Sequence, residues 1–210
     1  MRADGEGVVG LLLAGGLARR LGGGDKCLRP LGAYTILDVV IERARPQASP
    51  LLLNANGDAS RFSAFALPVV SDVIGGFSGP LAGILSGLEW ARANAPDCPW
   101  IASFATDTPF FPRDFVRCLV QAAAREGADL ACAASGDRVH PVFGLWPVRL
   151  AGALRHALEV EGIRKIDIWT ARYRLAVVKF PAQPFDPFFN VNSFADLAEA
   201  ERLLALVAQP

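Results

Sequence analysis

The sequence predicts an α/β fold, a Rossmann-like three-layer sandwich with a mostly parallel sheet. Several short segments are apolar at every position, which is typical of strands that are buried on both faces. Segments with the periodicity of amphipathic helices alternate with them along the chain, as in proteins with parallel sheets. Of the 210 residues, 52% are hydrophobic and 20% are charged, which indicates a globular protein with a sizeable core.

The first half of the chain contains most of this alternation. The expected strands cover Val8–Ala14, Pro50–Asn54, Leu67–Asp72 and Trp100–Asp107. The expected helices cover Ile36–Ala44, Gly79–Ala95 and Pro112–Gly127. In the second helix, apolar side chains recur at three- and four-residue steps, at Leu81, Ile84, Leu85 and Leu88. The third helix begins with proline and ends with glycine, as helices prefer.

The second half continues the pattern without a repeat or a linker. The expected strands are Ala128–Ala134, His140–Trp146 and Leu175–Phe180. The expected helices are Val148–Val160 and Phe194–Val207, the second with a capping box formed by Ser193 and Asp196. We therefore expect a flexible N-terminus at residues 1–7 and a single domain at residues 8–208.

Composition excludes several classes of partner. Lys and Arg together number 21, as do Asp and Glu, so the formal net charge is zero. This balance argues against a nucleic-acid binder or a membrane-surface protein. Cys27, Cys98, Cys118 and Cys132 lack metal-ligand spacing and are expected to be reduced, mostly buried thiols. We see no signal peptide or transmembrane span and expect a cytoplasmic protein.

Polar side chains or glycines follow the first four strands, at Ala14-Gly15-Gly16, Asn54, Asp72 and Asp107. Ligands of open α/β sheets bind at the carboxyl ends of the strands. The segment Leu11–Lys26 places glycines and the cations Arg19, Arg20 and Lys26 after the first strand. Backbone N–H groups of such a turn form an anion-binding nest, to which arginine and lysine add charge. Neither GxxxxGK[ST] nor GxGxxG is present, so no general motif identifies the phosphate. A glycine loop with solvated arginines remains the alternative.

This loop resembles the L-A-(G/A)-G-x-x-x-R-(M/L)-G-x-x-K signature of the superfamily that transfers NMP from an NTP. Within it, the chain resembles the molybdenum cofactor guanylyltransferases. Further matches follow in the family's order: Asn54–Asn56, Asp72, Gly79–Gly83, Ala105–Pro112, His140–Pro141 and Phe189–Phe194. One extra glycine in Gly22–Gly24 and the apolar Leu17 depart from the pattern without removing a proposed ligand. The resemblance covers residues 8 to 205 and implies a fold of the nucleotide-diphospho-sugar transferase type.

The resemblance implies a reaction and its participants. GMP would pass from GTP to molybdopterin, with Mg²⁺, or alternatively Mn²⁺, as the metal and pyrophosphate as the second product. Such a transfer depends on positioning and electrostatics and requires no protein nucleophile. GTP and molybdopterin would be the small-molecule partners. Molybdenum-insertion proteins or molybdoenzyme chaperones are possible protein partners.

The resemblance also implies roles for individual residues. Catalysis would rest on Arg20, Lys26 and Asp107, and Asp107 would be the metal ligand. The nucleotide would be bound by Leu13, Ala14, Gly15, Gly16, Gly23, Lys26, Asn54, Asp72 and Asp107. The acceptor side would be formed by Gly79, Gly83, Asn190, Asn192 and His140.

Several of these residues also have a structural interpretation. Asp107 and Asp72 could cap turns, and Gly79 and Gly83 could serve tight helix packing. Asn190 and Asn192 could form a turn before the last helix, and His140 could be structural rather than acceptor-side. A basic cluster of Arg164, Lys165, Arg172 and Arg174 could meet the acceptor's phosphate or be a solvated face.

The nucleotide and the class of protein have alternatives as well. The Ala14-Gly15-Gly16 run and the aspartate before Lys26 are features of guanylyl rather than cytidylyl relatives, and they favour GTP. The first alternative is a cytidylyltransferase, or another NTP transferase with a different phosphorylated acceptor. The second is a nucleotide-binding module without turnover.

Overall fold

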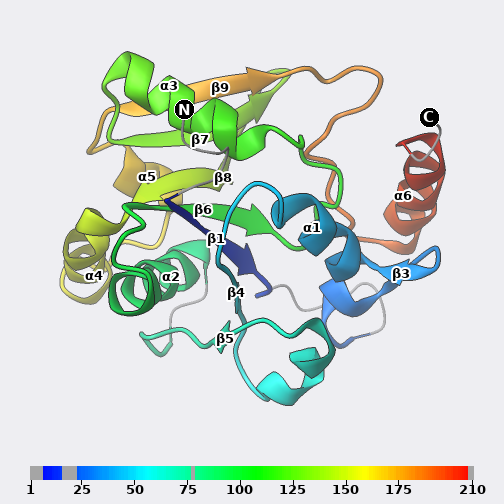
Figure 1. Cartoon of the computed structure of the whole chain (residues 1–210), viewed down its shortest axis with the longest axis horizontal. Coiled ribbons are helices and arrows are strands. Elements are labelled where there is room, and N and C mark those ends of the chain that lie inside the picture. The colour runs from blue at the N-terminus through cyan, green and yellow to red at the C-terminus, as the bar shows by residue number, and fades with distance from the viewer. Residues whose placement is uncertain (1–6, 16–22, 77–78, 208–210) are drawn as a thin grey trace.

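A seven-stranded sheet forms the middle layer of the molecule (Figure 1). The computed structural model describes residues 7–15, 23–76 and 79–207. The strands lie in the order β5-β4-β1-β6-β8-β7-β9, and only β8 runs antiparallel to its neighbours. Their bounds are β1 Val8–Leu13, β4 Leu51–Asn54, β5 Val69–Val70, β6 Trp100–Ala105, β7 Leu130–Ser135, β8 Arg138–Pro147 and β9 Leu175–Phe180.

Helices cover both faces of the sheet, so the expected three-layer sandwich is confirmed (Figure 1). One face packs against α1 Ile36–Ala44 and α3 Phe115–Glu126, while α6 Phe194–Val207 lies against Pro30–Leu31 and adds Leu203 to the same apolar core. The other packs against α2 Pro80–Asn94, α4 Ala151–Glu159 and α5 Ile166–Thr170. Alternate residues of β1 point to opposite faces, so that Leu12 joins the first apolar core and Leu11 the second. The first strand is apolar throughout because both of its faces are buried.

The reversed strand β8 brings a second part of the chain to the carboxyl edge of the parallel strands. β7 and β8 form a hairpin in which Ser135 pairs with Arg138. Because β8 runs against β6, its first residues lie at the edge where the parallel strands end. His140 is therefore placed at the carboxyl edge of the sheet.

Several short elements were not expected from the sequence. They are the 3-10 helices η2 Lys26–Leu28, η3 Ala59–Phe65 and η4 Val148–Leu150, the small strands β2 Pro30–Leu31 and β3 Tyr34–Thr35, and α5. The expected helix Val148–Val160 begins with η4, and its α-helical part starts only at Ala151. Elements of two to seven residues are too short to show a hydrophobic period.

The capping box at Ser193 and Asp196 is confirmed by its two hydrogen bonds. The expectation for the cysteines is only partly met. All four are free, but Cys27 and Cys132 are buried while Cys98 and Cys118 are partly exposed. Burial raises the pKa of the Cys27 thiol to about 12 and that of Cys132 to about 11. In the part of the chain described, no helix is long and apolar enough to cross a membrane.

Gly144 makes room for a fixed aromatic ring beneath α2 and α5. The indole of Trp146 folds back over Gly144, so a Cβ added there would lie 2.8 to 2.9 Å from three ring atoms. The ring cannot move away freely because Trp146 is 2% exposed and its Nε1 donates to Ser103 Oγ at 2.7 Å. The same hydroxyl donates to the carbonyl of Val142, which ties β6 to β8.

Replacing Gly144 with alanine should therefore lower the stability of the fold. Overpacking of a filled core costs about 1–3 kcal/mol, to be measured as the free energy of unfolding in urea. Gly152→Ala on α4 is the matched control, since a Cβ there meets nothing within 4 Å. The control should gain up to about 1 kcal/mol from helix propensity. Equal effects of the two substitutions would contradict this account of the core.

Candidate active site

Two groups of polar side chains gather at the carboxyl ends of the neighbouring strands β4, β1 and β6. One group follows β1 and β6 and contains Lys26 and Asp107. The other follows β4 and β5 and contains Asn54 and Asp72. These side chains are far apart in the sequence and meet because parallel strands end at one edge.

Lys26 stands at the centre of the first group. Its Nζ donates to Asp107 Oδ2 at 2.9 Å and to Asn192 Oδ1 at 2.7 Å. The side chains of Lys26 and Asp107 are 12% and 23% exposed, so water screens this ion pair less than one on the open surface. The contacts join the start of η2, the end of β6 and the segment before α6, so that three of the residues expected at the site lie together.

Asn190 joins the same group through Thr108. The Thr108 hydroxyl donates to Asn190 Oδ1 and lies 3.2 Å from Asp107 Oδ1. The backbone amide of Val191, between the two asparagines, donates to the carbonyl of Asp107 at 2.8 Å. Asn190 and Asn192 are therefore each connected to the Asp107 carboxylate through one further side chain, Thr108 and Lys26 respectively. Sequence reasoning gave Thr108 no role, although it directly follows the aspartate.

Asp196 holds the end of this segment. Its carboxylate accepts the amide hydrogens of Asn192 and Ser193, each at 2.9 Å. Burial alone would raise the pKa of Asp196, but these amide hydrogen bonds and the nearby charge of Lys26 lower it below its usual value. The helix cap of α6 thus also fixes the backbone of Asn192.

The second group is centred on the Asp72 carboxylate. It accepts Asn54 Nδ2 at 3.0 Å and Asn56 Nδ2 at 2.8 Å, while the Asp72 amide donates to Asn56 Oδ1 at 2.9 Å. Asn54 is buried and also donates to the carbonyl of Val70. Both asparagines are thereby fixed in orientation beside the end of β1, where the Ala14 amide donates to the Asn54 carbonyl.

Gly83 lies against this second group. A Cβ added to it would come within 2.3 Å of Asn54 Oδ1 and 2.7 Å of Leu13 Cδ2. The sequence placed Gly83 on the acceptor side, whereas the structure packs it against residues expected to bind the nucleotide. Gly79 caps the start of α2 with a φ of +153°, a conformation that favours glycine, and lies near the backbone of Arg164.

His140 belongs to a separate network at the same edge. Ser135 Oγ lies 2.8 Å from His140 Nε2 and donates to Asp186 Oδ1 at 2.7 Å. The imidazole stacks on Phe188 with ring centroids 4.6 Å apart. Burial lowers the pKa of His140 below its usual value, although Asp186 opposes that shift. The contacts connect His140 to the segment that leads into Asn190, rather than to Lys26.

The glycine-rich loop that is expected to bind phosphate is described only at its two ends. Gly15 is exposed after β1, and the carbonyl of Gly23 accepts Arg29 Nη2 at 2.6 Å. Gly16 and Arg20, both expected at the site, lie outside the described residues. Their roles stay predictions.

The basic cluster, for which the sequence left an acceptor-side role and a solvated face open, does not share one set of contacts. Arg172 forms a two-pronged ion pair with Glu161, at 2.9 and 2.5 Å. Lys165 is exposed at the start of α5, and the backbone of Arg164 lies beside Gly79. The solvated-face interpretation therefore fits Arg172.

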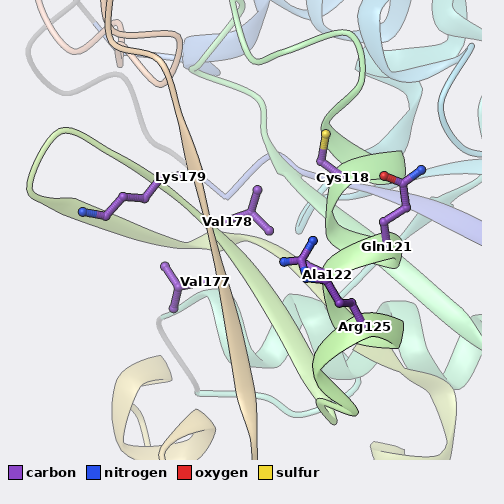
Figure 2. A pocket seen from close by; sticks show the side chains of 7 residues that line it. All are labelled: Cys118, Gln121, Ala122, Arg125, Val177, Val178 and Lys179. Carbon is purple, nitrogen blue, oxygen red and sulfur yellow. The ribbon is translucent and has the colours of Figure 1, made fainter.

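A pocket of 310 Å³ lies elsewhere, between α3 and β9 (Figure 2). Its wall combines the apolar Val178 and Ala122 with the side chains of Arg125 and Cys118. None of its lining residues belongs to the two polar groups, so it is not part of the candidate active site.

The first group offers oxygen atoms to a divalent cation. Asp107 supplies a carboxylate, and Asn190 and Asn192 supply amide oxygens. Among the described residues, no three His, Cys, Asp or Glu side chains cluster as metal ligands. This set fits Mg²⁺, which is usually bound by one or two carboxylates together with waters and substrate phosphates.

Two bacterial proteins with assigned names are similar to this chain over nearly its whole length. A protein from Nitrobacter hamburgensis, named molybdenum cofactor guanylyltransferase, is 57% identical over 197 residues, 94% of either chain. One of the same name from a Bradyrhizobium species is 57% identical over 199 residues, covering 95% of this chain and 94% of that one.

Solved structures show the same fold. Molybdopterin-guanine dinucleotide biosynthesis protein A from Archaeoglobus fulgidus superposes with a TM-score of 0.73 and 24% identity, covering 94% of this chain and 99% of that one. Rv0371c from Mycobacterium tuberculosis, in complex with manganese, superposes with a TM-score of 0.66 and 19% identity, covering 95% and 99%.

A family model described as the MobA-like NTP transferase domain matches residues 10–173. The matched region contains Lys26 and Asp107 of the first polar group and Asn54 and Asp72 of the second. Together with the two bacterial relatives, this match confirms the family resemblance of the ordered motifs. The chain belongs to the MobA-like NTP transferase family.

Proposed function

We propose that this chain transfers GMP from GTP to molybdopterin, releasing pyrophosphate and forming the guanine dinucleotide cofactor. The observation that carries the proposal is the contact of Lys26 with both Asp107 and Asn192 at the ligand-binding edge. It joins a cation for phosphates to the oxygen atoms for a metal. The relatives' name, molybdenum cofactor guanylyltransferase, supports the choice of substrates.

Lys26 binds the triphosphate in this proposal. Its ammonium group has three donors, and two are engaged by Asp107 and Asn192. The third is available for a phosphate oxygen, and the two hydrogen bonds keep the long side chain from moving away. Arg20 and the backbone amides around Gly15, Gly16 and Gly23 would complete the phosphate site.

Asp107 would hold Mg²⁺, or alternatively Mn²⁺, with Asn190 and Asn192 beside it. When bound, the cation offsets negative charge on the triphosphate oxygens as the bond to pyrophosphate breaks. Thr108 and the Val191 amide keep the carboxylate and the two asparagines in register.

The second group would bind the nucleoside end of GTP. Leu13, Ala14 and Asn54 surround the end of β1, and Asn54 and Asn56 hold the Asp72 carboxylate in place. A fixed carboxylate can accept hydrogen bonds from guanine N–H groups or ribose hydroxyls. Gly83 allows α2 to lie close enough to keep Asn54 in this position.

The acceptor would approach from the side of Asn190, His140 and Gly79. An oxygen of its phosphate forms a bond to the α-phosphorus of GTP, and the bond from that phosphorus to the bridging oxygen of pyrophosphate breaks. The attacking phosphate is already anionic near neutral pH, so no protein base is required. This agrees with the placement of His140 in its own network.

The remaining expectations complete the proposal. Residues 8–208 would work as one nucleotidyltransferase domain, since β1 and β4 to β9 share a single sheet. The four free cysteines support a cytoplasmic location. Molybdenum-insertion proteins or molybdoenzyme chaperones would be the protein partners.

The purified protein should release pyrophosphate from GTP when molybdopterin and Mg²⁺ are present, and form the guanine dinucleotide. The measurement is phosphate detection after pyrophosphatase treatment, with product identification by mass spectrometry. CTP and ATP in place of GTP serve as controls and should give much less product. Turnover with CTP alone would contradict the guanylyl assignment, and GTP binding without turnover would contradict an enzymatic role.

Replacing Lys26 with alanine should lower kcat/KM for GTP by at least about tenfold. A charge-assisted hydrogen bond is worth about 1.5–3 kcal/mol, and Lys26 also positions Asp107. Lys179→Ala is the control, because this lysine is exposed on β9. Near-normal kcat/KM of the Lys26 variant would remove this residue from the site.

Replacing Gly83 with alanine should raise KM for GTP, because the new Cβ displaces the Asn54 amide from Asp72. KM for molybdopterin should change little, and Gly152→Ala should change neither constant. If instead only KM for molybdopterin rises, Gly83 belongs to the acceptor side, as expected from the sequence.

A further inference from the structure

Arg61, in η3, contacts parts of the chain on both sides of the proposed GTP site. Its Nε donates to Asp25 Oδ2 at 2.5 Å, and its Nη2 lies 3.4 Å from Asp25 Oδ1. The same Nη2 donates to the backbone carbonyl of Asn56 at 2.7 Å. Asp25 directly precedes Lys26, and Asn56 holds the Asp72 carboxylate. One guanidinium therefore links the phosphate side to the nucleoside side.

The Arg61 side chain is held firmly. Its guanidinium lies 4.6 Å from the centroid of the Phe62 ring, and Phe62 is 1% exposed in the core. Nη1 donates to the carbonyl of Asp58. A guanidinium with its donors engaged and one face on an aromatic ring keeps a single orientation. Arg61 is thus a rigid support for Asp25 rather than a mobile surface charge.

Asp25 presents an electrostatic problem in a triphosphate site. Its carboxylate is 16% exposed and stands one residue before the lysine that binds phosphate. An unpaired negative charge at that position repels an incoming polyanion. The ion pair with the Arg61 guanidinium offsets the negative charge of Asp25 and fixes the backbone that leads into Lys26.

A second arginine supports the same stretch of chain. Arg29 Nη2 donates to the carbonyl of Gly23 at 2.6 Å. The described end of the phosphate loop, residues 23–26, is therefore braced by Arg29 at its first residue and by Arg61 at its third. Only Arg61 also reaches the segment that contains Asn56.

We propose that Arg61 is a positioning residue for GTP. It neutralises Asp25 and holds Lys26 at a fixed place relative to Asn56 and Asp72, so that phosphates and nucleoside are bound together. This inference rests on the proposed function, because it takes Lys26 and Asp72 as the two ends of the GTP site.

The charge account predicts different results for the two partners of the ion pair. Arg61→Ala leaves Asp25 unpaired beside the phosphates and should weaken GTP binding about tenfold, more strongly at low salt. Asp25→Asn leaves a positive charge instead, so GTP binding should stay equal or become tighter. Adding Asp25→Asn to Arg61→Ala should restore at least about threefold of the lost affinity. A merely structural pair predicts equal losses from either single substitution.

GTP affinity with Mg²⁺ is measured by calorimetry for the full-length wild type, the two single variants, the double variant and Arg61→Lys. The lysine keeps the charge but cannot reach Asp25 and Asn56 together, so it should recover only part of the affinity. Arg155→Ala is the matched control. Arg155 forms a comparable two-pronged pair with Glu89, at 2.8 Å for both contacts, and joins α4 to α2 away from the site. Its loss should lower stability and leave GTP affinity unchanged.

Unchanged affinity in Arg61→Ala, or no recovery in the double variant, overturns the proposal. So does a loss in Asp25→Asn as large as that in Arg61→Ala, and this isosteric variant keeps the test valid if Arg61→Ala fails to fold. Failure of the proposed function has a different signature, namely a wild-type protein that does not bind GTP at all. A wild type that binds GTP as tightly as Arg61→Ala removes only the role of Arg61.

Discussion

The ion pair between Lys26 and Asp107 is the contact on which the candidate active site depends. It joins the segment after β1 to the end of β6, and Asn192 extends it to the segment before α6. Because both charged groups are mostly shielded from water, neither is well placed without the other. In the proposed function, the same pair would bring together the two chemical requirements of nucleotidyl transfer, a cation for phosphates and a carboxylate for a divalent metal.

The rest of the fold serves to keep this contact at one edge. The parallel strands β4, β1 and β6 end beside one another, and the reversal of β8 brings His140 to the same edge. Helix α2 approaches closely at Gly83, and the cap of α6 fixes the backbone of Asn192. Arg61 then links Asp25, which directly precedes Lys26, to the backbone of Asn56. The stability of the sheet and the geometry of the site are therefore coupled.

Much of the fold and part of the site could be predicted from the sequence. The long, regular elements carried clear signals, as the apolar run of β1 and the spacing of Leu81, Ile84 and Leu88 in α2 illustrate. Short elements such as η3 could not be predicted, because a segment of seven residues without a hydrophobic period does not indicate a helix. Arg61, which lies in η3, was therefore missed as a functional residue. Thr108 was also missed as a functional residue, since its contact with Asn190 spans 82 positions.

The sequence alone determined the class of fold, the family and the residue types at the ends of the strands. These depend on local composition, on hydrophobic period and on the order of motifs, all of which are properties of the linear sequence. Only the tertiary structure decided which residues meet. In the structure, Lys26 contacts Asn192, and Gly83 packs against Asn54 instead of the asparagines near α6. His140 lies in a network with Ser135 and Asp186. The physical reason is that contacts between distant segments follow from strand order and strand direction, and the pattern of one segment does not encode its neighbour.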